Sequence, residues 1–256
     1  MAKFLTINIG NSHTTIAVFK NNQNFRQYCI PTGDKYEKLL SKVFLDPPEA
    51  VIICSVAPLA TRRFIRALKR FSSIKPLLLG KDISIPLKNE YTKPGQLGED
   101  RLVTSFAAII RYGAPLIVVD CGTALTINVV SADRSFRGGI ILPGIEMSLK
   151  ALSLYTAQLP FLERIGKKHV LIGKTTRECI ISGISNGFAA MVDGLIVKIK
   201  SVLGKKTIVI GTGGGINSIA PLTKQINKID NLLLHYGLYA LLHTHLKKPK
   251  NKKNLA

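Results

Sequence analysis

Residues 116–130 read LIVVDCGTALTINVV, and this stretch decides the fold class. Two apolar runs, Leu116–Asp120 and Leu125–Val130, flank the short segment Cys121-Gly122-Thr123-Ala124. Short β-type runs joined by a tight turn are typical of paired antiparallel strands. A glycine lets the turn backbone approach a ligand closely, and a threonine hydroxyl can donate a hydrogen bond to a phosphate oxygen. The stretch therefore predicts a strand–turn–strand unit suited to binding phosphate.

The same pattern occurs near the N-terminus. Asn8-Ile9-Gly10-Asn11-Ser12-His13-Thr14 aligns with Asp120-Cys121-Gly122-Thr123-Ala124-Leu125-Thr126, and both segments lie between apolar β runs. A single such turn is weak evidence, because any tight hairpin uses these residues. Two copies and the later turn Thr212-Gly213-Gly214 are stronger. No GxxxxGK[ST] run occurs, which excludes a P-loop NTPase.

The repeat is far too long for a solenoid, so it favours two related domains that face each other across a cleft. Alternating strand and helix patterns indicate α/β sheets. We expect a first domain at residues 1–114 and a second at 115–256, with the final helix a candidate to pack back on the first domain.

Local patterns refine this arrangement. Residues 80–99 show no periodicity and contain Pro86, Pro94, Gly95 and Gly98, which indicates a functional loop. Pro143 is expected to begin a helix. Residues 175–202 have helical spacing, with Gly183 and Gly187 as candidate breaks.

Composition limits the function classes. The chain has 36 Lys+Arg against 15 Asp+Glu, a formal net charge of +21, which can indicate nucleic-acid binding. The basic residues are scattered, however, and no RNP, zinc-finger or OB-fold signature accompanies them, so we expect no specific nucleic-acid partner. An anionic substrate pair or a basic proteome explains the sign equally well.

No apolar leader begins the chain, and the apolar run at residues 232–242 is too short to span a bilayer. We therefore expect a soluble, cytoplasmic protein. The four cysteines form no CxxC pair, so we expect buried free thiols and neither zinc nor disulfides: Cys29, Cys54, Cys121 and Cys179.

The order of the motifs resembles the type III pantothenate kinases, which belong to the acetate and sugar kinase, Hsp70 and actin superfamily. Six motifs in chain order carry the resemblance over nearly the whole sequence: Asn8–Ser12, Tyr91–Arg101, Asp120–Thr126, Arg137–Ile140 with Pro143-Gly144, Gly173–Thr176 with Ser182-Gly183, and Thr212–Gly214. The resemblance implies two duplicated RNase-H-like domains of the actin-like ATPase type with a central cleft. It also implies ATP-dependent phosphorylation of pantothenate to 4'-phosphopantothenate, the first step of coenzyme A biosynthesis.

The resemblance assigns Asp100 as the general base that accepts the proton of the pantothenate hydroxyl. An aspartate needs only hydrogen-bond reach and a suitable orientation for this role. The alternative is a cap on the helix that begins near Arg101. The pantothenate-binding positions would be Tyr91, Gly98, Glu99, Asp100, Arg101 and Thr176.

Thr176 would reach pantothenate from the partner subunit, so the resemblance implies a homodimer with shared sites. Each of these residues also has an ordinary alternative. Arg101 could be a solvated surface residue, Tyr91 a packing residue, and Thr176 an N-cap or first-turn residue of a helix.

The resemblance also implies the contacts to ATP. The ATP-binding positions would be Asn8, Ile9, Gly10, Asn11, Ser12, His13, Thr14, Thr15, Gly122, Thr123, Gly213 and Gly214. Asp120 corresponds to the family's ligand for a monovalent cation, potassium or ammonium. Mg²⁺ would accompany ATP and neutralise charge on the transferred phosphoryl group. A plain strand-to-helix turn is the alternative for Gly213 and Gly214.

Asn8 departs from the family pattern, which normally has aspartate at this position. Asparagine keeps the size and the hydrogen bonding but loses the charge, so binding of the cation and of Mg²⁺–ATP should weaken. We expect an active but weakened kinase. The alternatives are a regulatory or accessory protein on the same scaffold that no longer turns over, and a kinase of the same superfamily with another small substrate.

Overall fold

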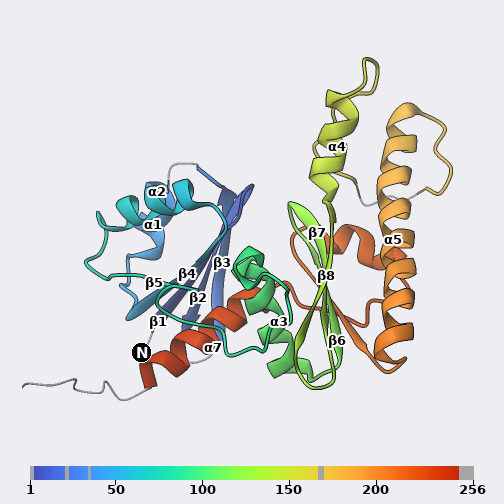
Figure 1. Ribbon diagram of the computed structural model, residues 1–256. Coiled ribbons are helices and arrows are strands. Elements are labelled where there is room, and N and C mark those ends of the chain that lie inside the picture. Colours follow the sequence, from blue (N-terminus) through green and yellow to red (C-terminus); the bar gives the residue numbers. More distant parts are fainter. Residues whose placement is uncertain (1–2, 21–22, 34–35, 167–169, 248–256) are drawn as a thin grey trace, which may run out of the picture. The chain divides into compact units, whose positions relative to one another are not determined.

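The computed structural model describes residues 3–20, 23–33, 36–166 and 170–247 (Figure 1). The chain forms two compact units: unit 1 comprises residues 1–86, 98–103 and 234–256, and unit 2 comprises residues 87–97 and 104–233. His169 and most of the basic tail at residues 247–253 lie outside the described residues. The domain boundary at residue 114 stays a prediction.

Unit 1 is built on a mixed sheet of five strands in the order β3-β2-β1-β4-β5. β1, β2 and β3 pair antiparallel, whereas β4 is parallel to β1 and β5 is parallel to β4. The strands are β1 (Lys3–Ile9), β2 (His13–Lys20), β3 (Gln23–Pro31), β4 (Ala50–Ser55) and β5 (Leu77–Leu78). The helices are α1 (Glu37–Val43), α2 (Pro58–Leu68) and most of α7 (Leu233–Lys247).

Unit 2 repeats this design. Its strand order, read from the edge strand β8, is β8-β7-β6-β9-β10, with the same parallel and antiparallel pairings as in unit 1. The strands are β6 (Leu116–Cys121), β7 (Ala124–Val130), β8 (Phe136–Pro143), β9 (Ile208–Thr212) and β10 (Lys228–Ile229). The helices are α4 (Ile145–Leu154), α5 (Thr176–Leu203), α6 (Ile216–Ile219) and the larger part of α3 (Glu99–Tyr112). The identical order confirms the predicted duplication.

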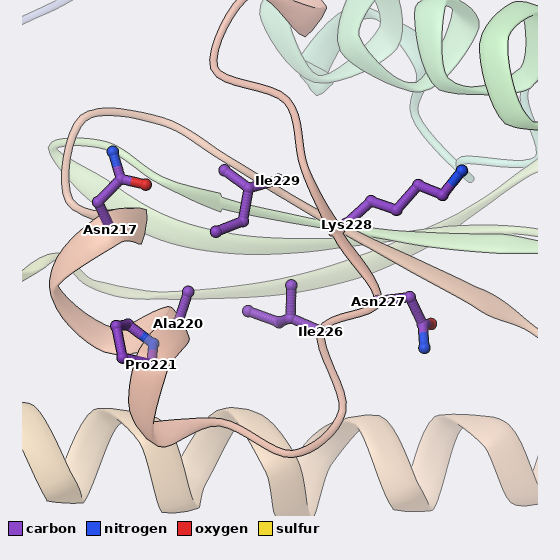
Figure 2. Close-up of a pocket in the computed structure, with 7 residues that line it drawn as sticks. All are labelled: Asn217, Ala220, Pro221, Ile226, Asn227, Lys228 and Ile229. Carbon is purple, nitrogen blue, oxygen red and sulfur yellow. The ribbon is translucent and has the colours of Figure 1, made fainter.

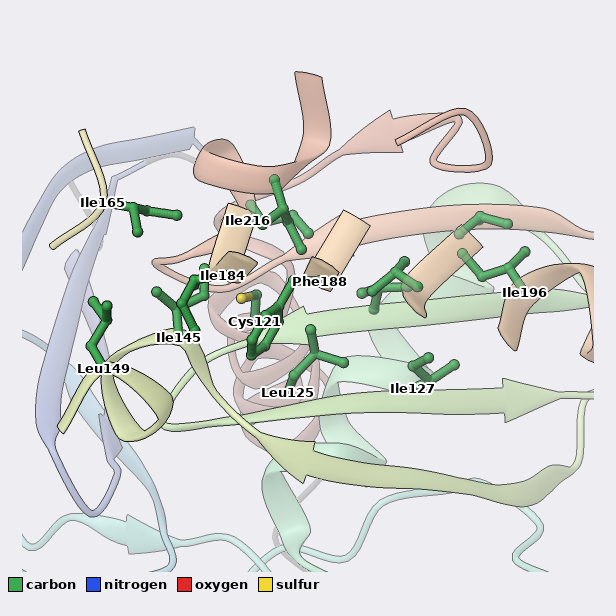
Figure 3. Close-up of a cluster of buried hydrophobic side chains, with 14 of the residues drawn as sticks. Cys121, Leu125, Ile127, Ile145, Leu149, Ile165, Ile184, Phe188, Ile196 and Ile216 are labelled. Atoms are coloured by element: carbon green, nitrogen blue, oxygen red, sulfur yellow. The ribbon is translucent and has the colours of Figure 1, made fainter. Parts of the chain in front are cut away.

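Side-chain alternation gives each sheet one apolar and one mixed face. In unit 1, Leu5, Ile7 and Ile9 of β1 join a buried cluster with side chains of α1 and α2. Asn8 therefore lies on the opposite face of the sheet. In unit 2, Ile117, Val119 and Cys121 of β6 pack with α4, α5 and α6 in the cluster of Figure 3, and Asp120 lies on the opposite face. Asn8 and Asp120 thus hold corresponding positions near the ends of the two central strands.

The two hairpin turns differ in length by one residue. Ile9 pairs with Thr14, which leaves residues 10–13 in the first turn. Cys121 pairs with Leu125, which leaves only residues 122–124 in the second. The partner of Asn8 is consequently Thr15, although the partner of Asp120 is Thr126. The gapless sequence alignment is therefore correct before the turn and wrong by one residue after it.

Two local predictions about helices are also wrong. Pro143 does not begin a helix; it ends β8, where it pairs with Ala124, and Gly144 is the N-cap residue of α4. The Gly144 amide is held in place because it donates to the Thr123 carbonyl at 3.1 Å. The two glycines that were candidate breaks lie within the uninterrupted 28-residue helix α5.

Among the described helices, α5 alone is long and apolar enough to cross a membrane by length and composition. Its buried residues, which include Ile184, Phe188 and Val192, contribute to the core of unit 2 (Figure 3). A core helix of a soluble protein has the same features, so α5 is weak evidence for a membrane span.

Candidate functional site

Unit 1 brings two predicted site segments to the carboxyl ends of its parallel strands. β1 leads into the turn at residues 10–13, and β4 ends at Ser55 beside it, with Asn8 paired to Cys54. The first turn of α3, which carries Asp100, lies at this edge, because a Cβ atom added at Gly98 would be 3.8 Å from Val56 Cγ1, just after β4. Ligands of open α/β sheets bind outside the carboxyl ends of the strands. The arrangement is therefore that of a ligand site.

Thr32, which follows β3, forms hydrogen bonds that stabilise the first glycine turn. The Gly10 amide donates to the His13 carbonyl at 3.0 Å, which closes the turn. The Thr32 hydroxyl donates to the Gly10 carbonyl at 2.8 Å, and the Thr32 amide donates to the Ser12 carbonyl at 2.8 Å. Nothing in the sequence indicated this role for Thr32, because its contacts depend on the register of β3.

Asp100 lies in the first turn of α3, where its Oδ1 accepts the Arg101 amide at 2.9 Å. A Cβ atom at Gly98 would overlap this same carboxylate oxygen. Glycine at position 98 therefore leaves room for the Asp100 side chain. The helix begins at Glu99, slightly earlier than predicted.

The surroundings of Asp100 disfavour its charged form. Burial raises the pKa of the carboxyl, although the amide and the guanidinium of Arg101 oppose this shift. Burial also raises the pKa of Glu99, and the charge of Asp100 raises it further. A carboxyl group with a raised pKa is a better proton acceptor than an exposed one, which suits a general base.

Arg101 is 8% exposed, so it is not the solvated surface residue of the simplest interpretation. A guanidinium near a half-buried carboxylate can still present its planar fork to an anion. Glu99 is packed against Gly80, where an added Cβ would lie 2.6 Å from Glu99 Oε1. The start of α3 is thus tightly fixed within unit 1.

Unit 2 packs three glycine-containing turns together. Gly213 has φ +88°, and a Cβ atom there would overlap Asp120 Oδ1 and lie 2.7 Å from the Cys121 carbonyl. The Gly215 amide donates to the Cys121 carbonyl at 2.9 Å. A Cβ at Gly144 would overlap the Thr123 carbonyl oxygen. Only glycine allows the turns at 122–123 and 213–214 to approach each other this closely.

Tyr91 also belongs to unit 2, where its segment runs beside β8. Its ring centroid lies 6.3 Å from that of Phe136, and its amide donates to Asn89 Oδ1 at 2.9 Å. Glu90 forms an ion pair with Arg137 at 3.0 Å. The ordinary alternative, a half-buried packing residue, describes the ring of Tyr91 correctly.

Thr176 begins α5, but it is not the cap. The cap is Thr175, whose Oγ1 accepts the Glu178 amide at 3.2 Å. Thr176 is an exposed first-turn residue. The alternative of an N-cap or first-turn residue is therefore correct in its second form, since Thr175 is the cap and Thr176 lies in the first turn.

No group of three or more His, Cys, Asp and Glu side chains gathers to hold a metal ion in the described part of the chain. The Asp120 carboxylate, with the oxygen atoms of the adjoining turns, offers hard oxygen donors and a single charge. This donor set fits a monovalent cation or a largely hydrated Mg²⁺. Of the four free cysteines, Cys54 and Cys121 are buried as expected, whereas Cys29 and Cys179 are exposed.

A separate hollow of about 400 Å³ lies in unit 2 between α6 and β10 (Figure 2). Its lining includes Asn217, Ile226 and Lys228, and none of the predicted site residues. The neighbouring Asn227 uses its Oδ1 to accept the Val209 amide at 2.8 Å. Sequence reasoning did not find this hollow.

Comparisons with known proteins agree with the motif order. The profile of the type III pantothenate kinase family matches residues 4–198. The chain is 35% identical over 252 residues to the type III pantothenate kinase of Persephonella marina, covering 94% of this chain and 98% of that one. It is 37% identical over 247 residues to that of Shouchella clausii, covering 91% and 96%.

A solved structure shows the same fold. The activator of 2-hydroxyisocaproyl-CoA dehydratase from Clostridium difficile, solved with bound ADPNP, superimposes with a TM-score of 0.57 at 13% identity, covering 99% of each chain. At this identity the likeness extends to the fold alone. It confirms the expected α/β class of duplicated RNase-H-like units.

Proposed function

Because this chain belongs to the type III pantothenate kinase family, we propose that Asp100 is the general base in its ATP-dependent phosphorylation of pantothenate. The product is 4'-phosphopantothenate, and the reaction is the first step of coenzyme A biosynthesis. The observation that carries the role of Asp100 is its half-buried carboxyl with a raised pKa, beside the end of β4.

The proposed step is an in-line transfer. The pantothenate hydroxyl oxygen attacks the γ-phosphorus of ATP as the bond to the bridging oxygen breaks, and ADP leaves. Asp100 accepts the hydroxyl proton, so charge and atoms balance. Arg101 would hold the carboxylate of pantothenate, and Tyr91, Gly98, Glu99 and Thr176 are proposed to complete the pantothenate contacts.

ATP would bind through the glycine turns. In unit 1 the proposed contacts are residues 8–15, and in unit 2 they are Gly122, Thr123, Gly213 and Gly214. Asp120 would hold a potassium or ammonium ion, and Mg²⁺ would supply charge neutralisation on the phosphates. Because ATP is drawn from the cytoplasm, we expect the protein to act there.

The decisive test is a coupled assay of the purified full chain with pantothenate and excess Mg²⁺–ATP, with and without potassium. We expect phosphopantothenate to form, with higher activity when potassium is present. Failure to form any product under these conditions would reject the kinase assignment. A screen of other small alcohols would then separate another kinase activity from a protein without turnover.

Asn8→Asp restores the aspartate that the family normally has. We expect the KM for ATP to fall by about 3- to 10-fold, because a carboxylate adds charge for a cation where the amide has none. The KM for pantothenate should stay within about twofold. Steady-state kinetics of both proteins checks this. A rise from no activity to full activity would instead favour the regulatory protein without turnover.

We also propose a homodimer in which Thr176 completes the partner's site. Support comes from a run of large apolar side chains that unit 2 exposes between α4 and α5. Tyr155, Leu171 and Ile172 are 83%, 75% and 82% exposed. Several large apolar side chains exposed in one connecting segment favour an interaction site, and Thr176 lies four residues after Ile172.

The double variant Leu171→Asp/Ile172→Asp should be monomeric, because burying two carboxylates in an apolar interface is unfavourable. We expect kcat/KM to fall at least tenfold. Light scattering and kinetics measure the two effects. Val202→Asp is the matched control, since Val202 is 85% exposed at the other end of α5; it should remain dimeric. A dimeric and fully active double variant would show that the interface lies elsewhere.

A further inference from the structure

His235 is a buried histidine that belongs to none of the sequence motifs. It lies near the start of α7 and is 3% exposed. Both ring nitrogens meet a threonine hydroxyl: Nδ1 lies 2.8 Å from Thr6 Oγ1, and Nε2 lies 2.9 Å from Thr15 Oγ1. Thr6 belongs to β1 and Thr15 to β2. One side chain from the last helix therefore links both strands that carry the first glycine turn.

The hydrogen bonds assign the proton on the ring. Burial lowers the pKa of His235 to about 4, so the imidazole is neutral near pH 7 and has one donor and one acceptor. The single hydrogen of the Thr6 hydroxyl is donated to the Ala17 carbonyl at 3.4 Å. Toward His235, Thr6 Oγ1 must therefore be the acceptor, and Nδ1–H must be the donor. Nε2 is then the acceptor for the Thr15 hydroxyl. This tautomer follows from the network, and an apolar residue could not make either bond.

The two threonines flank Asn8. Thr15 is the direct cross-strand partner of Asn8 in the antiparallel ladder, so their side chains share a face. Thr6 precedes Asn8 by two residues, which places it on the same face of β1. The turn at residues 10–13 follows immediately. His235 thus fixes the neighbours of Asn8 along the strand and across it.

We propose that His235 is a positioning residue for the nucleotide site. Its two hydrogen bonds hold β1 and β2 in the register that presents Asn8 and the Gly10–His13 turn to the ATP phosphates. The inference rests on the proposed function of this turn. It assigns no contact between His235 and the nucleotide.

His235→Leu removes both bonds and keeps a buried side chain of similar bulk. We expect the KM for ATP and the Kd for Mg²⁺–ADP, measured by calorimetry, to rise about 5- to 100-fold. The KM for pantothenate should change less than twofold. Thr6→Val should act in the same direction, because it removes the partner of Nδ1, and its double variant with His235→Leu should bind ADP no more weakly than His235→Leu alone.

His235→Gln keeps one donor and one acceptor, so it should recover part of the nucleotide affinity. His245→Leu is the matched control, because His245 lies on the same helix and is exposed; it should bind ADP like the wild type. If His235→Leu does not fold, Thr6→Val and His235→Gln provide the same comparison.

The nucleotide titration separates this inference from the catalytic assignment. A wild type that binds ADP but makes no phosphopantothenate would reject the proposed function and leave the positioning role intact if His235→Leu weakens binding. Equal ADP affinity in wild type and His235→Leu, with only a lower melting temperature, would show that His235 merely packs. A wild type that binds no nucleotide would reject both.

Discussion

Asp100→Asn should lower kcat by about 10²- to 10⁴-fold and raise the melting temperature of the protein. The loss of rate follows because the amide cannot accept the hydroxyl proton, and general-base catalysis typically contributes a factor of this size. The gain in stability follows from the raised pKa of Asp100 in the folded protein. Kinetics at saturating substrates and thermal unfolding at pH 7 measure the two effects on the same sample.

The sign of the stability change can be worked out from linkage. A carboxyl whose folded pKa lies above its unfolded value binds its proton more tightly in the folded state. Its ionisation therefore destabilises the fold, and this loss is absent at low pH and fully present above the folded pKa. Asparagine has no charge to bury, so the difference between Asp100→Asn and wild type should vanish as the solution is acidified.

Asp46→Asn is a control for which we expect a change in stability of the opposite sign. A hydrogen bond and ion pair with Lys20, 2.9 Å away, lower the pKa of Asp46. This variant should therefore lose a little stability near neutral pH and keep its kcat. A normal kcat for Asp100→Asn, or a lower melting temperature, would show that Asp100 is an ordinary structural residue.

The pH dependence of kcat should show the same ionisation. The base works only when Asp100 is ionised, so kcat should fall as pH decreases through a pKa above the usual 3.8 of aspartate. Glu99 lies beside it with a raised pKa of its own, so the acidic limb belongs to the coupled pair. Glu99→Gln should reduce this limb to the ionisation of Asp100 alone, because it removes the second titrating carboxyl group of the pair.

The sequence was sufficient to predict the two duplicated domains, because the same order of residue types occurs twice along the chain. The apolar runs around Gly10 and Gly122 predicted two equivalent sheets, and the strand orders agree. The extra residue in the first turn was not predictable, since a register is set by cross-strand pairing rather than by local pattern.

Contacts between segments far apart in the sequence could not be predicted from local patterns either. The hydrogen bond from His235 to Thr6 joins residues 229 positions apart, and no spacing rule connects them. The sequence could identify Gly98 and Gly213 as motif glycines. Only the structure shows that each makes room for an aspartate, Asp100 in unit 1 and Asp120 in unit 2.

Gly213→Ala should both destabilise unit 2 and abolish tight nucleotide binding. The backbone at Gly213 has φ +88°, a conformation that costs an alanine about 1–3 kcal/mol. The added Cβ would also overlap Asp120 Oδ1 and crowd the Cys121 carbonyl at 2.7 Å, and overpacking typically costs a further ~1–3 kcal/mol. We expect a total loss of about 2–6 kcal/mol in the free energy of unfolding, measured with denaturant.

Gly214→Ala separates the two causes, because Gly214 is next in the chain and has nothing within 4 Å of its hypothetical Cβ. Its φ is not positive, so its free energy of unfolding should change by less than about 1 kcal/mol. If Gly213→Ala unfolds at the wild-type denaturant concentration, the turns at 122–123 and 213–214 do not require the close approach described for them. If it loses stability but binds ADP normally, the Gly213 turn is structural, and the nucleotide contact must come from other residues. Only the combined loss, with Gly214→Ala stable, supports a turn whose tight packing against Asp120 shapes the binding site.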